Sequence, residues 1–469
     1  MMRLSVATLS GLPGDIDRPR YDRAGIGTGV VHLGIGAFHR AHQAVFFEHA
    51  LNAGDLRWGV TGASLRSPAV HEALAPQDGL YSVVTRDGAA ERVQVVGAVR
   101  DVLVAPRDPA ALVARLAARD THIVTLTVTE KGYASSAADS AAGYLAAALA
   151  ERRSTGVDPF TAISCDNLSD NGGRLKQAVL AAARQSDPAL ADWIEHQVAF
   201  PSSMVDRIVP ATDEDDIARL AGRIGVEDRA MVKTEPFRQW VIEDRFSGPR
   251  PDLAAAGVQL TADVAPWEEA KLRLLNGSHS AIAYLGGLAG IDFVHEVIAL
   301  PAARAFVAAL MDETAATLTP PPGLDVPAYR AALLARFANP ALQHRTRQIA
   351  MDGSQKLPQR LLAPIIARLD RGLAAPALTL AVAAWMAWTG GRNDLGAAHA
   401  VEDPLASVVA DALGKATAPE DRVAALLSLS QIFPVRLAGD QSFRQALIDD
   451  LALLQEQGAR AAFARFTGR

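Results

Sequence analysis

The stretch 271–279 has an asparagine five residues and a histidine eight residues after a lysine. Read as an α-helix, which turns about 100° per residue, it places His279 about 80° and Asn276 about 140° from Lys271. Glu268, upstream, falls about 60° away, so the four polar groups share one side of the helix. Lys271 borders an apolar stripe, and burial of its stem would disfavour the charged amine. Because a neutral amine is a usable general base near neutral pH, the spacing predicts acid–base chemistry.

A solvated helix face is the alternative, since isolated polar side chains on a helix commonly face water. Asn276-Gly277 is nevertheless a poor pair for a helix interior. The following segment 278–280, Ser-His-Ser, stands where packing alone would favour apolar residues. Local preferences of this kind are broken mainly at functional sites, which favours the catalytic interpretation.

Length and composition indicate a globular protein with more than one domain. The chain has 469 residues, which is too many for one compact core, and 49% of them are hydrophobic and 21% charged. The formal net charge is −6 and no basic block occurs, so we expect no nucleic-acid partner. A single cysteine, Cys165, excludes an intrachain disulfide and fits a reducing compartment. Without an apolar leader or a membrane-length segment, we expect a cytoplasmic protein that does not contact membranes.

A glycine turn follows the first apolar run, 30–33. Gly34 permits a tight turn, and Gly36 lets a backbone approach a pyrophosphate at the N-terminus of the next helix. The third glycine of the usual fingerprint is replaced by His39. Many such turns bind nothing, but the position after the first strand of an α/β pattern favours a dinucleotide site. The predicted cofactor contacts at this turn are Gly34, Ile35, Gly36, Ala37 and Phe38.

The residues after two further strands bear on the cofactor. No acidic residue follows the strand 58–63, where one would bind the adenosine ribose. Arg66 stands there instead and is either a contact for a 2′-phosphate or an ordinary surface arginine. These residues leave the choice between NAD and NADP open; NAD is the cofactor that we expect. The buried run 123–128 leads to Thr129, Glu130 and Lys131, which are either cofactor or substrate contacts at the carboxyl end of a strand or a loop ion pair.

Two more polar residues lie near strand ends. Asn167 follows the strand 160–164, and its amide is suited to holding an alkoxide or carbonyl oxygen, although an Asx turn is a common alternative. Asp206 lies in the polar segment 200–207 and is a candidate for orienting the lysine or substrate hydroxyls. Beyond residue 271 the pattern is almost wholly helical. We therefore predict an α/β fold with a Rossmann-type dinucleotide-binding domain over 1–255 and a helical substrate and catalytic domain over 256–469.

Six segments together resemble the polyol-specific long-chain dehydrogenase/reductase family, also called the mannitol dehydrogenase family. They are GIGAFHRAHQAVFFEHAL, TVTEKGY, SCDNLSDNG, FPSSMVDRIVP, EPFRQWVIEDRF and KLRLLNGSHS. The K-x4-N-x2-H spacing resembles the catalytic signature of this family. The later segment NPALQHRTRQIAMDGSQKLPQRLL and the pair Glu130-Lys131 look closer to its fructuronate reductase (D-mannonate oxidoreductase) branch than to its mannitol dehydrogenase branch.

The resemblance implies catalytic roles without a metal. Lys271 would be the general acid/base, and Asn167 and Asn276 would hold the reacting oxygen as charge develops on it. His279 would orient the substrate.

Further roles follow from the same resemblance. Asp206 would contact substrate and Glu268 would open a proton route to solvent. A sugar acid also needs a cation for its carboxylate. We select Lys356 and Arg347 from a basic group that also includes Arg345 and Arg360; a solvated basic face or a contact between domains is the alternative.

The expected activity is an NAD(P)-dependent exchange between a secondary alcohol of a sugar acid or polyol and its ketone. D-Mannonate and D-fructuronate are the expected pair, with mannitol and fructose, or another polyol, as the alternative. A non-catalytic dinucleotide sensor is the alternative from a different class. A metal-dependent alcohol oxidation would need ligands such as His39 and His42, for which we expect a structural or phosphate-contact role. The family includes many monomers, so a monomer is the expected state.

Overall fold

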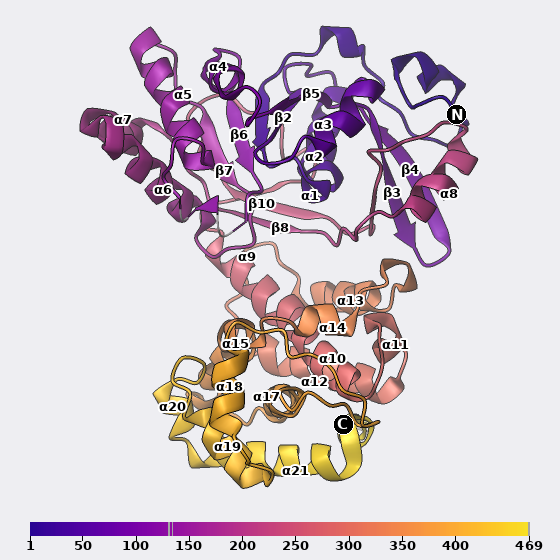
Figure 1. The fold of residues 1–469 in the computed structure, drawn as a ribbon, viewed down its shortest axis with the longest axis vertical. Helices are drawn as coiled ribbons and strands as arrows, with labels where there is room; N and C mark the ends of the chain where they lie inside the picture. Colours follow the sequence, from indigo (N-terminus) through magenta and orange to yellow (C-terminus); the bar gives the residue numbers. More distant parts are fainter. Residues whose placement is uncertain (130–131, 134, 468–469) are drawn as a thin grey trace. The chain divides into compact units, whose positions relative to one another are not determined.

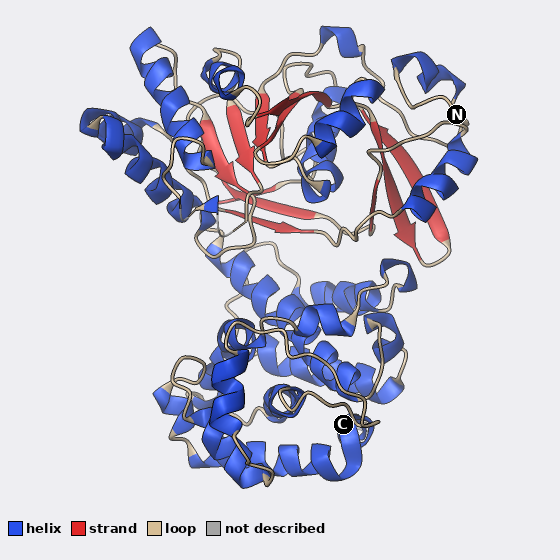
Figure 2. Ribbon diagram, viewed as in Figure 1, coloured by secondary structure: helices blue, strands red, loops and turns tan. Residues whose placement is uncertain are grey.

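The computed structural model describes residues 1–129, 132–133 and 135–467 (Figure 1). Its contacts divide the chain into two compact units, Met1–Ala265 and Pro266–Arg469, here called unit 1 and unit 2. Unit 1 combines strands and helices, whereas the regular elements in the described part of unit 2 are helices (Figure 2). This confirms the predicted fold class. The predicted contacts Glu130 and Lys131 lie outside the described residues.

A five-stranded parallel sheet is the centre of unit 1, in the order β5-β2-β1-β6-β7. The chain builds one half outward from β1, then crosses to the other side and adds β6 and β7. The strand order therefore reverses between β1 and β6, where open α/β sheets bind ligands beyond the carboxyl ends of their strands. The strands are β1 (Val30–Leu33), β2 (Val60–Ser64), β5 (Val99–Val104), β6 (Ile123–Leu126) and β7 (Thr161–Ser164).

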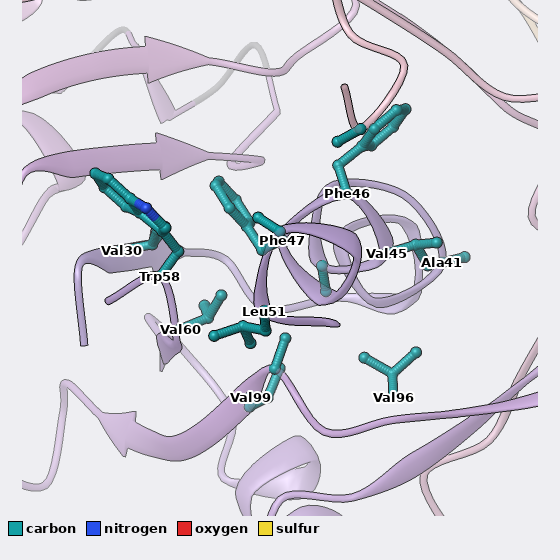
Figure 3. Packing of buried hydrophobic residues seen from close by; sticks show 14 of the residues in the cluster. Val30, Ala41, Val45, Phe46, Phe47, Leu51, Trp58, Val60, Val96 and Val99 are labelled. Atoms are coloured by element: carbon teal, nitrogen blue, oxygen red, sulfur yellow. The ribbon is translucent and has the colours of Figure 1, made fainter. Parts of the chain in front are cut away.

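Helices or aromatic side chains cover both faces of this sheet. Val31 and Val124 pack into a core with α4 (Pro109–Ala117), α5 (Ala141–Thr155), α6 (Asn171–Ser186) and α7 (Pro188–Gln197). Val30, on the other face, packs in a cluster with Trp58, Phe46 and Phe47 (Figure 3). Alternate residues of one strand thus enter two different cores, which explains why these strands are continuously apolar in sequence.

Two small sheets complete unit 1. The order in the first is β4-β3-β9, and in the second β11-β10-β8. The strands β3 (Tyr81–Asp87) and β4 (Ala90–Val96) form an antiparallel hairpin, and the segment EPFRQWVIEDRF contains a strand, β10 (Gln239–Glu243). The remaining elements are α1 (Ala37–Ala41), α2 (Gln43–Asn52), α3 (Ala69–Leu74), β8 (Ser203–Asp206), α8 (Glu214–Ile224), β9 (Val232–Thr234) and β11 (Gln259–Thr261).

Unit 2 is built around α10 and α17, which pack on each other and on the long helix α21. The helical pattern is broken at Pro301, which begins a new helix, because proline suits a first helical turn and not an interior one. The described helices are α9 (Ala265–Ala270), α10 (Gly277–Leu288), α11 (Val294–Ile298), α12 (Pro301–Ala315), α13 (Val326–Phe337), α14 (Thr346–Ala350), α15 (Gly353–Leu357), α16 (Ala363–Leu369), α17 (Pro376–Trp388), α18 (Ala406–Leu413), α19 (Pro419–Leu427), α20 (Val435–Ala438) and α21 (Gln441–Ala464). None of the helices in the described residues is both long and apolar enough to cross a membrane.

Candidate functional site

The lysine–asparagine segment of unit 2 is a π-helix, η5 (Lys271–Asn276), inserted between α9 and α10. The backbone N–H of Gly277 donates to the carbonyl of Leu272, five residues earlier, as in a π-helix. The predicted helical angles therefore do not hold across this segment, because they assume a regular α-helix. Since residues five apart are paired in a π-helix, Lys271 and Asn276 lie on the same side of successive turns. The irregular backbone brings the two polar residues closer in angle than the prediction placed them.

The side chains singled out on this helix are buried. Lys271 and Asn276 are each 9% exposed and His279 is 8% exposed. The His279 ring packs against Phe337 and His344, with ring centroids 4.6 and 5.1 Å away. Burial lowers the pKa of His279 well below its usual value, so the ring is neutral at neutral pH. Its Nε2 has no hydrogen-bond partner among the described residues, which leaves a polar atom for a substrate hydroxyl.

A second π-helix, η7 (Pro358–Leu362), packs against η5. The Arg360 guanidinium on η7 donates to the Ser280 hydroxyl at 3.1 Å and reaches the Asn276 carbonyl at 3.5 Å. Burial lowers the pKa of Arg360 to about 10. A Cβ added to Gly277 would lie 3.0 Å from the Arg360 carbonyl oxygen. The glycine that looked out of place in a helix thus allows the two π-helices to approach each other.

The other cations differ in their surroundings. Lys356 lies one turn before Arg360 and donates to the Ile349 carbonyl at 3.4 Å and to that of Met351; burial lowers its pKa. Arg347, by contrast, is 58% exposed and lies 3.6 Å from Glu402.

Two further predicted positions in unit 2 are also defined. The Arg345 guanidinium stacks 4.9 Å from the centre of the Phe293 ring. Glu268, the residue predicted for the proton route, is half-buried on α9, three residues before Lys271. Of the four basic candidates, Lys356 and Arg360 have the most enclosed charges.

In unit 1 the glycine turn after β1 is tightly constrained. Gly34 has φ +90°, and an added Cβ would lie 2.2 Å from the Thr127 carbonyl oxygen. Its N–H donates to the Ala63 carbonyl at 2.8 Å, and the Thr127 hydroxyl donates to the Gly34 carbonyl at 2.8 Å. Gly36 caps α1 and is exposed, and a Cβ added there would have only the Gly34 oxygen nearby, at 3.8 Å. Open space beside this backbone fits the close approach of a pyrophosphate.

The other residues of the turn pack around it. Ile35 is 2% exposed and fills the space left by Gly62, so its backbone alone faces outward. Ala37 begins α1, and Phe38 stacks on His42 with ring centroids 5.0 Å apart. The helix predicted after the turn is interrupted at His42, which has φ −123° and ψ −87° between α1 and α2.

The histidines of the HRAH segment lie in the interior of unit 1. His39 stacks on His32 with ring centroids 3.5 Å apart, and His42 Nε2 lies 2.8 Å from the Gln239 carbonyl oxygen. Burial lowers the pKa of His42 to about 3 and that of His39 well below its usual value. Among the described residues, no group of three or more His, Cys, Asp or Glu side chains is arranged to hold a metal ion.

The carboxyl ends of β6 and β7 are joined by Asp166, a residue that was not among the predicted contacts. Its carboxylate accepts the N–H groups of Val128 at 3.0 Å and Thr129 at 2.9 Å, and the Tyr133 hydroxyl at 2.5 Å. Thr129 is held at φ +67°, a conformation uncommon outside glycine that concentrates at functional sites. Asn167 follows Asp166 directly and is exposed. In the sequence, the only indication of these Asp166 hydrogen bonds was the position of a carboxylate directly before Asn167.

Parallel pairing gathers predicted cofactor contacts of unit 1 and the predicted catalytic residue Asn167 at one sheet edge. The glycine turn, exposed Arg66, Thr129 and Asn167 all follow the carboxyl ends of neighbouring strands. Asp206 ends β8 and is 4% exposed. The first residue of β8, Ser203, donates to the Ser164 carbonyl at 2.6 Å, which joins that strand to the end of β7.

Comparison with known proteins gives matches over nearly the whole chain. The Mannitol dehydrogenase Rossmann domain matches residues 28–255 and the Mannitol dehydrogenase C-terminal domain matches residues 263–455. D-Mannonate oxidoreductase of Escherichia coli (strain K12) is 42% identical over 97% of this chain and 98% of its own length.

Two solved structures extend this similarity to the fold. Pseudomonas fluorescens mannitol 2-dehydrogenase, in a ternary complex with NAD and D-mannitol, has 34% identity, a TM-score of 0.85 and 99% coverage of both chains. Substrate-free D-sorbitol dehydrogenase has 31% identity and a TM-score of 0.92, with 99% of this chain and 100% of that one covered. The chain therefore belongs to the mannitol dehydrogenase family.

Proposed function

We propose that this protein is an NAD-dependent dehydrogenase that interconverts a secondary alcohol and a ketone on a sugar acid or polyol. D-Mannonate and D-fructuronate are the proposed pair. Membership of the mannitol dehydrogenase family supports the class of reaction. The similarity to D-mannonate oxidoreductase, at 42% identity, supports the choice of D-mannonate and D-fructuronate as substrates. The observation that carries the proposal is the buried π-helix with Lys271 and Asn276 on one side and a neutral His279 on the next turn.

The proposed chemistry uses Lys271 as the group that takes the hydroxyl proton during oxidation and returns it during reduction. The amides of Asn276 and Asn167 donate to the reacting oxygen, where negative charge develops. His279, neutral and with Nε2 available, orients a neighbouring hydroxyl. NAD supplies the hydride acceptor for oxidation and the reduced cofactor supplies the hydride for the reverse reaction. Glu268, one turn from Lys271, is the proposed exit for the proton.

The glycine turn of unit 1 supports the choice of a dinucleotide. The positive φ of Gly34 and the open space beside Gly36 fit a pyrophosphate against the start of α1. NAD is the ligand of the mannitol 2-dehydrogenase that has this fold. Arg66 is exposed after β2, and its positive charge would pair with the additional 2′-phosphate if NADP were bound.

Charge supports a sugar acid over an uncharged polyol. Lys356 and Arg360 are partly buried cations. Lys356 lies 3.8 Å from the Asp352 carboxylate. Arg360, on the π-helix that packs against η5, donates to the Ser280 hydroxyl and has no ion pair with a carboxylate among the described residues. A substrate carboxylate would supply that missing charge. Asp206 is the proposed contact for substrate hydroxyls.

A substrate panel tests the proposal. Initial rates with fructuronate and with fructose, each with NADH and with NADPH, should give a kcat/KM at least about 100-fold higher for fructuronate with NADH, as expected for a lost charge-assisted contact. Lys356→Met should reduce that ratio, with Lys176→Met, on the surface of α6, as the matched control. A preference for fructose would refute the sugar-acid assignment and leave the reaction class intact, whereas no oxidation or reduction of any polyol or keto acid would refute the reaction class.

A further inference from the structure

A groove of about 890 Å³ lies within unit 1, between α2 and the β3–β4 hairpin. One face of α2 forms a wall with Val45, His49 and Asn52, which are spaced as neighbours on a helix surface. Alternate residues of the hairpin, including Thr85 and Gln94, form another wall. Among the described residues that line the groove, none belongs to the glycine turn or to the other proposed cofactor and substrate contacts. The groove lies beside Asp206, the proposed substrate contact, which directly precedes its lining residue Arg207, but does not include it.

Positive charge predominates in this groove. Its basic lining residues are Arg18, Arg20, His49, Arg92, Arg207 and Arg238, and its acidic ones are Asp17, Asp87 and Glu91. Two of the acids are already paired. Glu91 accepts from Arg86 at 2.9 Å and from Arg223 at 2.8 Å, and Asp17 lies 2.6 Å from Arg92. These pairs leave several arginines without a carboxylate to balance them.

Arg207 and Arg238 are the most informative of these cations. Arg207 is 9% exposed, and its guanidinium donates to the Glu235 carbonyl at 2.9 and 3.2 Å and to the Ala41 carbonyl. The charge of the Glu235 side chain offsets part of the charge of Arg207. The Arg238 guanidinium lies 4.8 Å from the centre of the Phe46 ring and makes no hydrogen bond or ion pair with another described residue. Burial and the nearby charge of Arg92 both lower the pKa of Arg238. Mutual repulsion in a partly desolvated groove favours an anion there.

We propose that this groove binds a phosphoryl group carried by a small polyhydroxylated molecule. Several unbalanced arginines exceed the charge of one carboxylate and match a dianion, and the planar guanidinium donates to phosphate oxygens in a two-pronged arrangement. The groove is much larger than phosphate alone, and Asn52, Thr85 and Gln94 offer hydrogen-bonding groups for hydroxyls. The site is independent of the proposed dehydrogenase activity, and a ligand there would be an effector and not a substrate.

Calorimetric titration tests this site in the full-length protein saturated with NADH, so that the cofactor's own phosphates fill the site at the glycine turn. Inorganic phosphate and glycerol 3-phosphate are titrated at constant ionic strength. We expect saturable binding of one equivalent, tighter for the ester. Arg238→Gln should weaken it at least 10-fold, whereas Arg245→Gln, which removes an exposed arginine outside the groove that pairs with Glu243 at 3.1 Å, should leave it unchanged.

Arg92→Gln provides a second variant with little risk to folding, because the Arg92 side chain is 77% exposed. It should weaken phosphate binding by a smaller factor than Arg238→Gln. An ester that binds no more tightly than inorganic phosphate would overturn the assignment of a larger ligand. Absence of saturable binding in the unmodified protein, or equal weakening by Arg238→Gln and Arg245→Gln, would overturn the site itself.

Discussion

The glycine turn of unit 1 and the π-helix η5 of unit 2 both depart from regular backbone geometry, but only the turn is indicated by its own residue types. At the turn, a residue with positive φ, Gly34, is fixed by hydrogen bonds to Ala63 and Thr127 on the neighbouring strands. At η5, the support comes from a second π-helix, whose Arg360 contacts the Asn276 carbonyl from 84 residues further along the chain. Both irregularities depend on distant segments, since Thr127 lies 93 residues after Gly34. The turn, however, has a glycine where the backbone needs a positive φ, whereas no residue type at η5 predicts a π-helix.

The largest expected effect separates the chemistry of η5 from cofactor binding at the turn. Lys271→Ala should lower kcat by about 1,000-fold, the typical contribution of a general acid/base, because no other group at that position would take the proton. The affinity for NADH, measured by fluorescence titration, should stay within about twofold. Lys176→Ala, on the surface of α6, is the control. Near-normal turnover by Lys271→Ala would mean that a different residue is the base.

A smaller effect, on stability, is expected from the turn itself. Gly34→Ala should destabilise unit 1 by about 3 kcal/mol, because an L-residue is strained at φ +90° and its Cβ would meet the Thr127 oxygen at 2.2 Å. Gly36→Ala is the matched control. Its Cβ meets nothing closer than 3.8 Å, so stability should hold while NADH binds more weakly. Urea unfolding measures the stability of both variants, and NADH titration measures their affinity for the cofactor. Equal losses of stability in Gly34→Ala and Gly36→Ala would show that steric fit at Gly34 is not what fixes the turn.

The same comparison explains what the sequence could predict. The strand Val30–Leu33 and the turn after it could be predicted, because an apolar run and glycine spacing directly reflect the local backbone. The lysine, asparagine and histidine were recognised from their types and spacing, but their helix was assumed to be regular. A π-helix has no local sequence signature here, since its stability comes from packing against η7. Asn276-Gly277 indicated an irregularity without showing its form.

Two other features were inaccessible to sequence reasoning for a similar reason. Asp166 joins the ends of β6 and β7 through bonds to Val128 and Thr129, and such a contact is visible only once the two strands are paired. The exposure of Arg347 and the enclosure of Arg360 depend on which turn of which helix each occupies. Residue type predicted that cations would be present in this segment, whereas tertiary packing decides which of them is desolvated.

The buried histidines give a pH test of both regions. His279 in unit 2 and His32, His39 and His42 in unit 1 have pKa values lowered by burial, so each is neutral when folded. The unfolded chain binds the additional protons below pH 6.5, so stability falls as the pH is lowered through that value. Each histidine should contribute about 1.4 kcal/mol of this loss between pH 7.5 and 5.5.

His279→Gln should therefore reduce the pH dependence of the unfolding free energy by about 1.4 kcal/mol over that interval. The exposed histidine His196→Gln should leave it unchanged. Urea unfolding at the two pH values measures both. An unaltered pH dependence in His279→Gln would indicate that this ring is already protonated in the folded protein.

The smallest expected effect tests the contact between the two π-helices. Gly277→Ala gains up to about 1 kcal/mol in helix propensity, but its Cβ would lie 3.0 Å from the Arg360 oxygen and must push η7 away slightly. Because these contributions oppose each other, the unfolding free energy should change by less than about 1 kcal/mol. The displaced Asn276 and Lys271 should instead lower kcat about 10-fold, since catalysis is sensitive to small shifts in position.

Gly222→Ala on α8 separates the two contributions, because nothing lies within 4 Å of its added Cβ. It should stabilise the protein by up to about 1 kcal/mol through helix propensity alone and leave kcat unchanged. Gly277→Ala should have a lower unfolding free energy than Gly222→Ala. The difference between the two variants measures the cost of the close contact with η7. If both substitutions stabilise equally and both leave kcat unchanged, η5 keeps its geometry without close packing on η7, and the contrast drawn with the glycine turn fails.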